Sequence, residues 1–446
     1  MLGIVADALN LTTMPVPTNA ANLALNLAYI FSITLLVGLL LKFWLISRQI
    51  RHVAYHRHAV PIAFANTIAL VSHQKAADYT ITKLRIGLLE LALGAATLMG
   101  WTLLGGLSAL NQVLLGWFGG DGMGKQLALF VTFVLINGLI EMPLGLYQTF
   151  VLEARFGFNK TTLKLWLVDA VKSSLIGLAI GLPIIYLVLW LMGAAGAQWW
   201  VWAWGAWVGI SLLLLWLFPT FIAPLFNRFM PLEDQTLKDR VTALMTQCGF
   251  KSEGLFVMDG SKRSAHGNAY FTGFGAAKRV VFYDTLLAKL STDEVAAVLA
   301  HELGHFNHRH IRHRLLMQFG LSFAGFALLG WLAAQPWFYA GLGVQPNLGG
   351  SNDGLALLLF VLTVPVVSFF LTPILSWISR RHEFQADAYA VAHTSGQDLA
   401  AALLKLYDDN ASTLTPDPIY ARFHYSHPPA SERLAQLLRP VAPLTS

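Results

Sequence analysis

Five consecutive residues, His301 to His305, carry the side chains best suited to metal chemistry. They read His-Glu-Leu-Gly-His. On a helix, positions four apart lie one above the other, so the imidazoles of His301 and His305 can bind one metal ion. The carboxylate of Glu302 lies one step round the helix, where it can take a proton from a zinc-activated water without binding the metal. The pattern indicates a zinc peptidase, and the alternative is a chance match in a histidine-rich helix.

The residues around this motif predict the helix that must position it. Ser291 can cap the start of the helix, and Glu294, three residues later, completes a capping box. Apolar residues then recur at helical spacing, without a proline, as far as Arg314. We therefore expect one helix over residues 291–314. The histidines that follow the motif are expected to form a solvated basic rim: His308, His310 and His313.

A third metal ligand should be acidic, because the motif supplies only two histidines. The segment 379–390 is helical in composition and carries Glu383 and Asp387 four residues apart on one face. Glu383 can bind zinc, while Asp387 braces a histidine ligand from behind. The alternative is a solvated helix face on which Arg380 and Arg381 pair with the two acids.

The composition indicates a membrane protein. Of the 446 residues, 56% are hydrophobic and 12% are charged, and the mean hydropathy is +0.57, too apolar for a soluble chain of this length. A helix needs about 20 apolar residues to cross a bilayer. We predict a mostly α-helical polytopic protein whose seven spans lie near residues 23–43, 86–109, 127–150, 174–191, 200–221, 315–334 and 355–378.

Basic residues predict the orientation of these spans. Lys and Arg are absent before the first span, and the loops around Gly119, Gly196 and Asn347 contain almost none. They gather after the first and third spans, as Arg48, Arg51, Arg57, Lys75, Lys83, Arg155, Lys160 and Lys164. Positive residues favour the cytoplasmic side, so we expect the N-terminus outside and the C-terminus in the cytoplasm. The net charge of +6 lies beside spans and indicates contact with the bilayer, not with nucleic acid.

The spans divide the chain into alternating membrane and cytoplasmic blocks. We expect membrane segments at 1–226 and 315–378, and cytoplasmic segments at 227–314 and 379–446. Each cytoplasmic segment is small for an independent core, and the candidate ligands are split between them, so the two should form one domain. Cys248 is the single cysteine, which excludes an internal disulfide framework and a cysteine-rich zinc site.

Two further segments have features suited to binding a peptide. Residues 264–273 and 279–284 predict a small β-hairpin, whose exposed edge could add a substrate strand held by Asn268. The alternative is an ordinary hairpin with the asparagine in its turn. His427 precedes Pro428 and Pro429, which stiffen the backbone of a side chain that could stabilise an oxyanion. A loop contact is the alternative for this histidine.

These motifs together resemble the type I CAAX prenyl proteases, which are integral-membrane zinc endopeptidases also called a-factor converting enzymes. The matching segments follow one another in order and cover most of the chain: residues 73–79, 155–160, 266–273, 301–305, 380–390 and 424–434. The resemblance implies seven long helices around an intramembrane chamber, roofed by the metalloprotease domain. It also implies one zinc ion bound by His301, His305 and Glu383, with Glu302 as general base.

The resemblance also implies roles on the substrate side. Asn268 would grip the substrate backbone, His427 would stabilise the tetrahedral intermediate, and Arg433 would support the site by pairing with Asp387. The expected substrate is a prenylated or membrane-associated C-terminal peptide, cut by a monomeric enzyme. Residues 442–446 carry no endoplasmic-reticulum retrieval signal, so we expect a bacterial inner membrane, or the endoplasmic reticulum if the source is eukaryotic.

Two other functions fit parts of the sequence. One is a membrane quality-control zinc protease without prenyl specificity, against which the seven spans and the N-terminal motifs stand. The other is a non-catalytic chamber or transporter with structural zinc. A closed structural site has no bound water to activate, so this function would not need Glu302.

Overall fold

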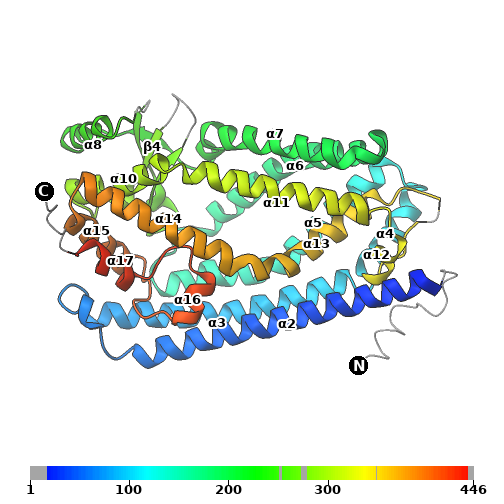
Figure 1. Ribbon diagram of the computed structural model, residues 1–446, viewed down its shortest axis with the longest axis horizontal. Helices are drawn as coiled ribbons and strands as arrows, with labels where there is room; N and C mark the ends of the chain where they lie inside the picture. The colour runs from blue at the N-terminus through cyan, green and yellow to red at the C-terminus, as the bar shows by residue number, and fades with distance from the viewer. Residues whose placement is uncertain (1–17, 251–253, 273–278, 348, 440–446) are drawn as a thin grey trace, which may run out of the picture.

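The fold is a bundle of long helices with a small sheet and several short helices at one end (Figure 1). The computed structural model describes residues 18–250, 254–272, 279–347 and 349–439. Within these ranges, seven helical stretches are long and apolar enough to cross a membrane, which confirms the seven predicted spans. They are Asn19–His56, Leu70–Trp101, Met123–Glu153, Leu163–Ala194, Gly196–Leu225, His310–Leu332 and Asp353–His393.

The helices of the membrane region have the following bounds: α2 Thr18–His56, α3 Leu70–Trp101, α4 Gly106–Phe118, α5 Met123–Tyr147, α6 Leu163–Ala194, α7 Trp199–Leu217, α11 His310–Leu332, α12 Pro336–Gly341 and α13 Asp353–Ser368. The other helices are α8 Gln235–Gln247, α9 Asp284–Leu287, α10 Thr292–Asn307, α14 Thr372–His393, α15 Gly396–Asp409, α16 Pro418–His424 and α17 Ala430–Leu437. A short 3-10 turn, Phe369–Leu371, joins α13 to α14, so the seventh span continues into the segment that carries Glu383.

The second span ends earlier than predicted. Its helix stops at Trp101, and the chain restarts as α4 at Gly106, so the predicted end at residue 109 is wrong. Gly105, the residue before α4, has a φ of 77°, a left-handed conformation that glycine adopts at little cost and that turns the chain between the two helices. The predicted apolar stretch therefore runs across a break, which its hydrophobicity alone did not reveal.

The predicted hairpin is half of a larger sheet. β3 (Ala269–Thr272) and β4 (Arg279–Tyr283) pair antiparallel, as expected. β2 (Gly254–Met258) lies parallel to β4, and β1 (Phe229–Pro231) completes a mixed sheet of order β1-β2-β4-β3. The prediction of a small hairpin was therefore incomplete. β1 is too short to show an alternation of apolar and polar residues, and β2 pairs with β4, which follows it only after a long connection. β3 forms one edge of this sheet.

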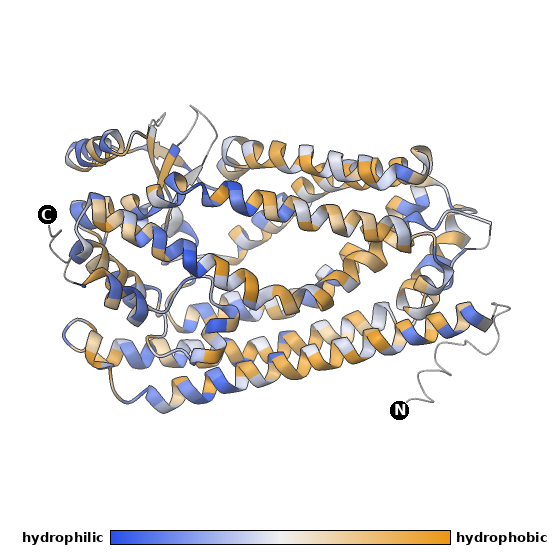
Figure 2. Cartoon of the chain, in the orientation of Figure 1, coloured by the Kyte–Doolittle hydropathy of each residue, from blue (hydrophilic) through white to orange (hydrophobic). Residues whose placement is uncertain are grey.

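Of the three apolar core clusters among the described residues, two lie at the two ends of the molecule. One joins the sheet to α8, α10, α15 and α17, and it includes Phe64 and Ile68 from the loop after the first span. The other packs α4 and α12 against the span ends that lie opposite the sheet (Figure 1). Figure 2 shows hydrophobic residues along the long helices and more hydrophilic ones at the sheet end. Only 6–39% of each span's apolar window is buried inside the protein, so most of its side chains face outward or towards an interior space.

The helix of the His-Glu-Leu-Gly-His motif is shorter than predicted. Its capping box is present: the Ser291 hydroxyl accepts from the Glu294 amide, and the Glu294 carboxylate accepts from the Ser291 amide. The helix ends at Asn307, however, and α11 starts at His310. Arg309 between them has a φ of 56°, a left-handed conformation that is uncommon outside glycine and that turns the chain. The prediction of one helix over 291–314 is therefore wrong.

Candidate metal centre and catalytic cavity

Close packing of α10 against α14 brings the candidate ligands together. Gly304 allows it: a Cβ atom at this position would lie 2.8 Å from the Cα of Ala386 and 3.0 Å from the Cβ of Tyr389. Real side chains do not tolerate such contacts, so the glycine of the motif lets the two backbones meet. This approach places His301 and His305 of α10 opposite Glu383 of α14.

The three candidate ligands converge on one point. Their ligand atoms all lie within 4.8 Å of one another. The Nε2 atoms of His301 and His305 are 3.3 Å apart, and Glu383 approaches them to 3.4 Å and 3.3 Å respectively. Two ligands at about 2.0–2.1 Å from a tetrahedral zinc ion are separated by about 3.3–3.4 Å. The spacing of these nitrogen and oxygen atoms therefore fits a zinc ion.

The burial of this cluster also fits a cation. His301 and Glu383 are buried, and the Oε2 atom of Glu383 has no hydrogen-bond partner among the residues that the structure describes. Buried carboxylate oxygens are normally hydrogen-bonded or bound to a cation. Two imidazole nitrogens facing each other beside this oxygen offer the nitrogen and oxygen donors that zinc prefers. The residues present thus suit the metal that the sequence predicted.

His301 is supported by a buried ion pair. Its Nδ1 lies 2.8 Å from Asp387, and Asp387 accepts two hydrogen bonds from Arg433. Burial lowers the pKa of His301, but the neighbouring carboxylates of Asp387 and Glu383 outweigh it and raise the pKa to about 9. A histidine must be neutral to bind zinc, so zinc uptake near neutral pH should release a proton. The structure therefore brings Asp387 and Arg433 together behind His301, as the resemblance implied.

His305 has a different support, which the sequence prediction missed. Its Nδ1 lies 3.0 Å from the Nδ1 of His310, and the Nε2 of His310 lies 2.9 Å from the Oε1 of Gln385. His310 is buried, so its prediction as part of a solvated rim is wrong, whereas His308 and His313 are exposed as expected. The turn at Arg309 folds His310 back against the motif. A continuous helix could not have shown this.

Glu302 and the three candidate metal ligands line one large cavity. This cavity has a volume of about 800 Å³ and contains His301, Glu302, His305, Glu383 and His427 in its wall. Glu302 is half-buried and opens into the same space as the ligands. Residues from the two neighbouring spans complete the apolar part of the wall: Met317, Leu321, Leu375 and Ile378. A carboxylate beside a metal cluster in a half-open cavity can act as a base towards a bound water.

His427 reaches the cluster from a third direction. Its Nε2 lies 3.4 Å from Glu383, although 64% of its side chain is exposed. Pro428 and Pro429, which follow it, are buried, and Arg380 donates a 2.6 Å hydrogen bond to the carbonyl of Tyr425, two residues earlier. The backbone on both sides is thus fixed while the imidazole faces the cavity. This arrangement matches the stiff segment that the two prolines predicted.

Asn268 lies farther from the cluster. It is exposed at the start of edge strand β3, and it is not part of the cavity wall. Its side-chain oxygen accepts from the Ala269 amide at 2.8 Å, and its carbonyl accepts from the Tyr283 amide at 3.0 Å. Tyr270, two residues on, does line the cavity. The structure therefore connects this strand to the cavity through Tyr270, and it does not bring Asn268 to the metal ligands.

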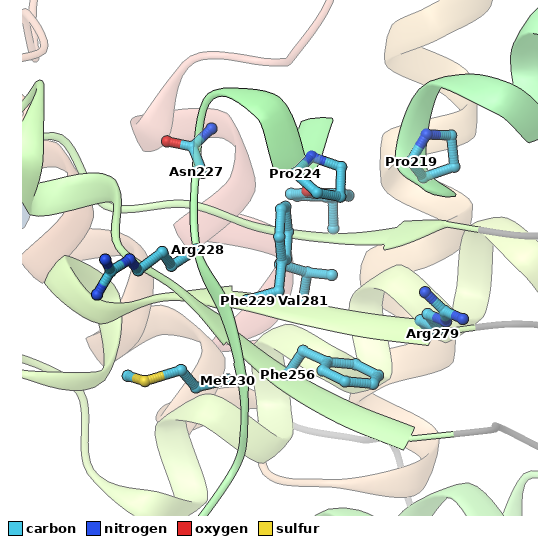
Figure 3. A pocket seen from close by; sticks show the side chains of 10 residues that line it. Pro219, Pro224, Asn227, Arg228, Phe229, Met230, Phe256, Arg279 and Val281 are labelled. Carbon is cyan, nitrogen blue, oxygen red and sulfur yellow. The ribbon is translucent and has the colours of Figure 1, made fainter. Parts of the chain in front are cut away.

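A second cavity lies on the far side of Tyr270. It has a volume of about 440 Å³, between the sheet and the segment that follows α7. Figure 3 shows Arg228 and Arg279 at opposite ends of an apolar lining that includes Phe229 and Phe256. None of the candidate metal ligands lines this cavity. The larger cavity is therefore the candidate catalytic site.

Comparisons with known proteins cover nearly the whole chain. Residues 49–228 match the family described as CAAX prenyl protease N-terminal, five membrane helices, and residues 231–441 match peptidase family M48. CAAX prenyl protease 1 of Saccharomyces cerevisiae is 40% identical over 314 residues, or 68% of this chain and 69% of that protein. The homolog of Homo sapiens is 32% identical, over 75% and 79% of the two chains.

A solved structure is also similar. The crystal structure of S. mikatae Ste24p aligns with a TM-score of 0.86 and 32% sequence identity, covering 92% of this chain and 99% of that one. The similarity therefore extends through both the long helices and the region that carries the candidate metal ligands.

Proposed function

Since this chain belongs to the CAAX prenyl protease family and is an integral-membrane metalloprotease, we propose that it binds one zinc ion through His301, His305 and Glu383. We assign the role of general base to Glu302. The observation that carries this proposal is the convergence of three ligand atoms within 4.8 Å, beside a carboxylate in the same cavity. The division of the chain at residues 226, 314 and 378 belongs to the same proposal.

The residues at the site can take distinct roles in peptide hydrolysis. A zinc ion held by His301, His305 and Glu383 would supply a water of lowered pKa and would polarise the substrate carbonyl. The Glu302 carboxylate would accept one proton of that water as its oxygen attacks the carbonyl, and would pass this proton to the leaving amine. His427 donates a hydrogen bond from Nε2 to the oxyanion that develops on the carbonyl. Asp387 accepts a hydrogen bond from the Nδ1–H group of His301, which keeps the lone pair of Nε2 available for a metal.

The proposed substrate is a prenylated or otherwise membrane-associated C-terminal peptide. The relatives are named CAAX prenyl proteases, and the position of the site supports a related substrate here. α14 carries Glu383 as a continuation of the seventh span, and α11 begins the sixth span three residues after α10 ends. The cavity wall combines the catalytic residues with apolar side chains of both spans. A peptide whose lipid lies in or near the membrane would reach such a site directly.

Edge strand β3 is the proposed docking strand of the peptide. A substrate strand added there would gain backbone hydrogen bonds and would run towards the cavity past Tyr270. Asn268, at the start of this strand, would then exchange its contact with the Ala269 amide for the backbone of the substrate. The same proposal places the metal site at the cytoplasmic face of the membrane, with the N-terminus outside and the protein acting as a monomer.

A cleavage assay with two matched peptides tests this function. The purified protein would be given a farnesylated CAAX peptide and the same peptide without the lipid, with Glu302→Gln protein as the blank. We expect zinc-dependent release of the last three residues from the farnesylated peptide and much slower release from the other. Equal rates on both peptides would instead favour a quality-control protease. No cleavage of either peptide would contradict the proposal.

A further inference from the structure

His310 occupies a special position behind the second histidine ligand. It is the first residue of α11, it is only 5% exposed, and the left-handed turn at Arg309 brings it back towards α10. The imidazole ring of His382 stacks on it, with ring centroids 4.0 Å apart and an interplanar angle of 11°. His310 is thus held in a fixed orientation by a turn on one side and a stacked ring on the other.

The hydrogen bonds of His310 fix which nitrogen of each ring carries a proton. His305 directs its Nε2 towards His301 and Glu383, so a neutral His305 that binds metal there keeps its proton on Nδ1. That proton can be donated only to an unprotonated nitrogen, and the Nδ1 of His310 lies 3.0 Å away. His310 must then carry its own proton on Nε2.

The Nε2 proton of His310 also has an acceptor. The Oε1 atom of Gln385 lies 2.9 Å from this nitrogen. Gln385 follows Glu383 by two residues on α14. Each donor in the series from His305 to His310 to Gln385 therefore points the same way, and the series connects the helix of two ligands to the helix of the third.

We propose that His310 is a positioning residue for the zinc site. Its Nδ1 accepts a hydrogen bond from the Nδ1–H group of His305, and this bond sets the tautomer and the ring orientation of that ligand. The two histidine ligands are then supported differently. His301 donates to Asp387, which is paired with Arg433, whereas His305 donates to the neutral ring of His310, and His310 in turn donates to the Gln385 amide oxygen. The inference rests on the proposed zinc ligands, but it does not depend on the identity of the substrate.

Zinc affinity, measured without substrate, tests this role. The purified full-length protein would compete for Zn²⁺ with a chromophoric chelator. His310→Leu keeps an apolar side chain of similar reach but has no acceptor, so we expect a loss of zinc affinity of about 10- to 100-fold. His310→Asn places an amide oxygen near the position of Nδ1 and should therefore have a zinc affinity close to that of the wild type. His58→Leu, at an exposed histidine in the loop after α2, is the control and should bind zinc like the wild type.

Two further measurements separate positioning from folding. The melting temperature of each metal-free variant should match that of the wild type, and the absorption spectrum of Co²⁺ in the site should change in His310→Leu but not in His58→Leu. If His310→Leu does not fold, His310→Gln replaces it, since its amide reaches the position of Nε2 instead of Nδ1. The proposal requires tighter zinc binding by Asn than by Gln.

The outcomes distinguish this inference from the proposed function. Wild-type affinity in folded His310→Leu, or equal affinities of the Asn and Gln variants, would overturn the role of His310. Failure of the wild type itself to bind zinc would overturn the ligand assignment. Failure to cleave a farnesylated peptide, with the zinc affinities as expected, would overturn only the substrate.

Discussion

The three candidate metal ligands, His301, His305 and Glu383, and the two proposed substrate contacts, Asn268 and His427, lie in opposite kinds of surroundings. The candidate ligands lie on two closely packed helices, and His301 and Glu383 are buried. Asn268 and His427 lie on an edge strand and in a loop, and both are exposed. The packing of the fold thus fixes the groups proposed to bind zinc, whereas the groups proposed to meet a peptide remain accessible to it.

This difference has a physical origin. A metal ligand displaced by a fraction of an ångström loses its bond, so each ligand needs support from several directions. A group that grips a peptide makes its main contact only when the peptide arrives, and burying it beforehand would block that contact. Changes in the buried cluster should therefore alter metal content, and changes in the exposed segments should alter kinetics alone.

The largest effect is expected from Glu383→Ala. Removing the only acidic ligand should reduce zinc content to a small fraction of one ion per chain and abolish activity, because two histidines hold zinc weakly. Metal analysis and a peptidase assay on the same preparation check both results. Glu383→Gln retains one oxygen and should bind zinc with intermediate affinity. Full zinc occupancy in Glu383→Ala would show that another residue is the third ligand.

Glu302→Gln should separate chemistry from metal binding. The amide cannot accept the proton of the water, so activity should fall by about 10³- to 10⁴-fold while zinc content stays unchanged. Glu432→Gln, which changes an exposed carboxylate on α17, provides the matched control and should have wild-type activity. Near-normal turnover in Glu302→Gln would remove this residue from the mechanism.

His427→Ala tests the first of the two exposed groups. Loss of a hydrogen bond that strengthens in the transition state should lower kcat by about 100-fold, with little change in KM. Zinc content and melting temperature should match the wild type, because Pro428 and Pro429 still anchor the segment. His424→Ala, on α16 of the same segment, controls for the loss of a histidine. A lost metal in His427→Ala would contradict the division between the two regions.

The smallest effect is expected from Asn268→Ala. In our proposal this side chain binds the peptide backbone, so its loss should raise KM by about 10-fold and reduce kcat less. Steady-state kinetics on the farnesylated peptide would measure both constants. An unchanged KM would mean that Asn268 only holds its own turn through the Ala269 amide, as in an ordinary hairpin.

Local sequence patterns predicted much of this molecule. The apolar stretches identified seven spans, and the capping box at Ser291 and Glu294 marked the start of the motif helix. Spacing of four residues placed each candidate ligand on a helix face. These features depend on neighbours in the chain, which a single sequence displays directly.

The remaining features depend on contacts between distant segments. The helix break at Arg309 contains no glycine or proline, so nothing in the sequence indicated it. Because of this break, His310 is buried against His305 and is not part of the expected exposed rim. The pairing of β2 with β4 and the approach of His427 to Glu383 join residues far apart in the chain. Such contacts depend on how distant segments pack together. Hydrophobic periodicity shows which face of an element is buried, but it does not show which residues of two elements meet.

A zinc titration of metal-free protein is the direct test of whether peptidase activity depends on one bound zinc ion. The protein would be stripped with a chelator, and activity on the farnesylated peptide would be followed as Zn²⁺ is added back, alongside direct metal analysis. We expect activity to be lost on stripping and to return in proportion to bound zinc, with its maximum at one ion per chain. Full activity in protein shown to be free of metal would contradict this dependence on zinc.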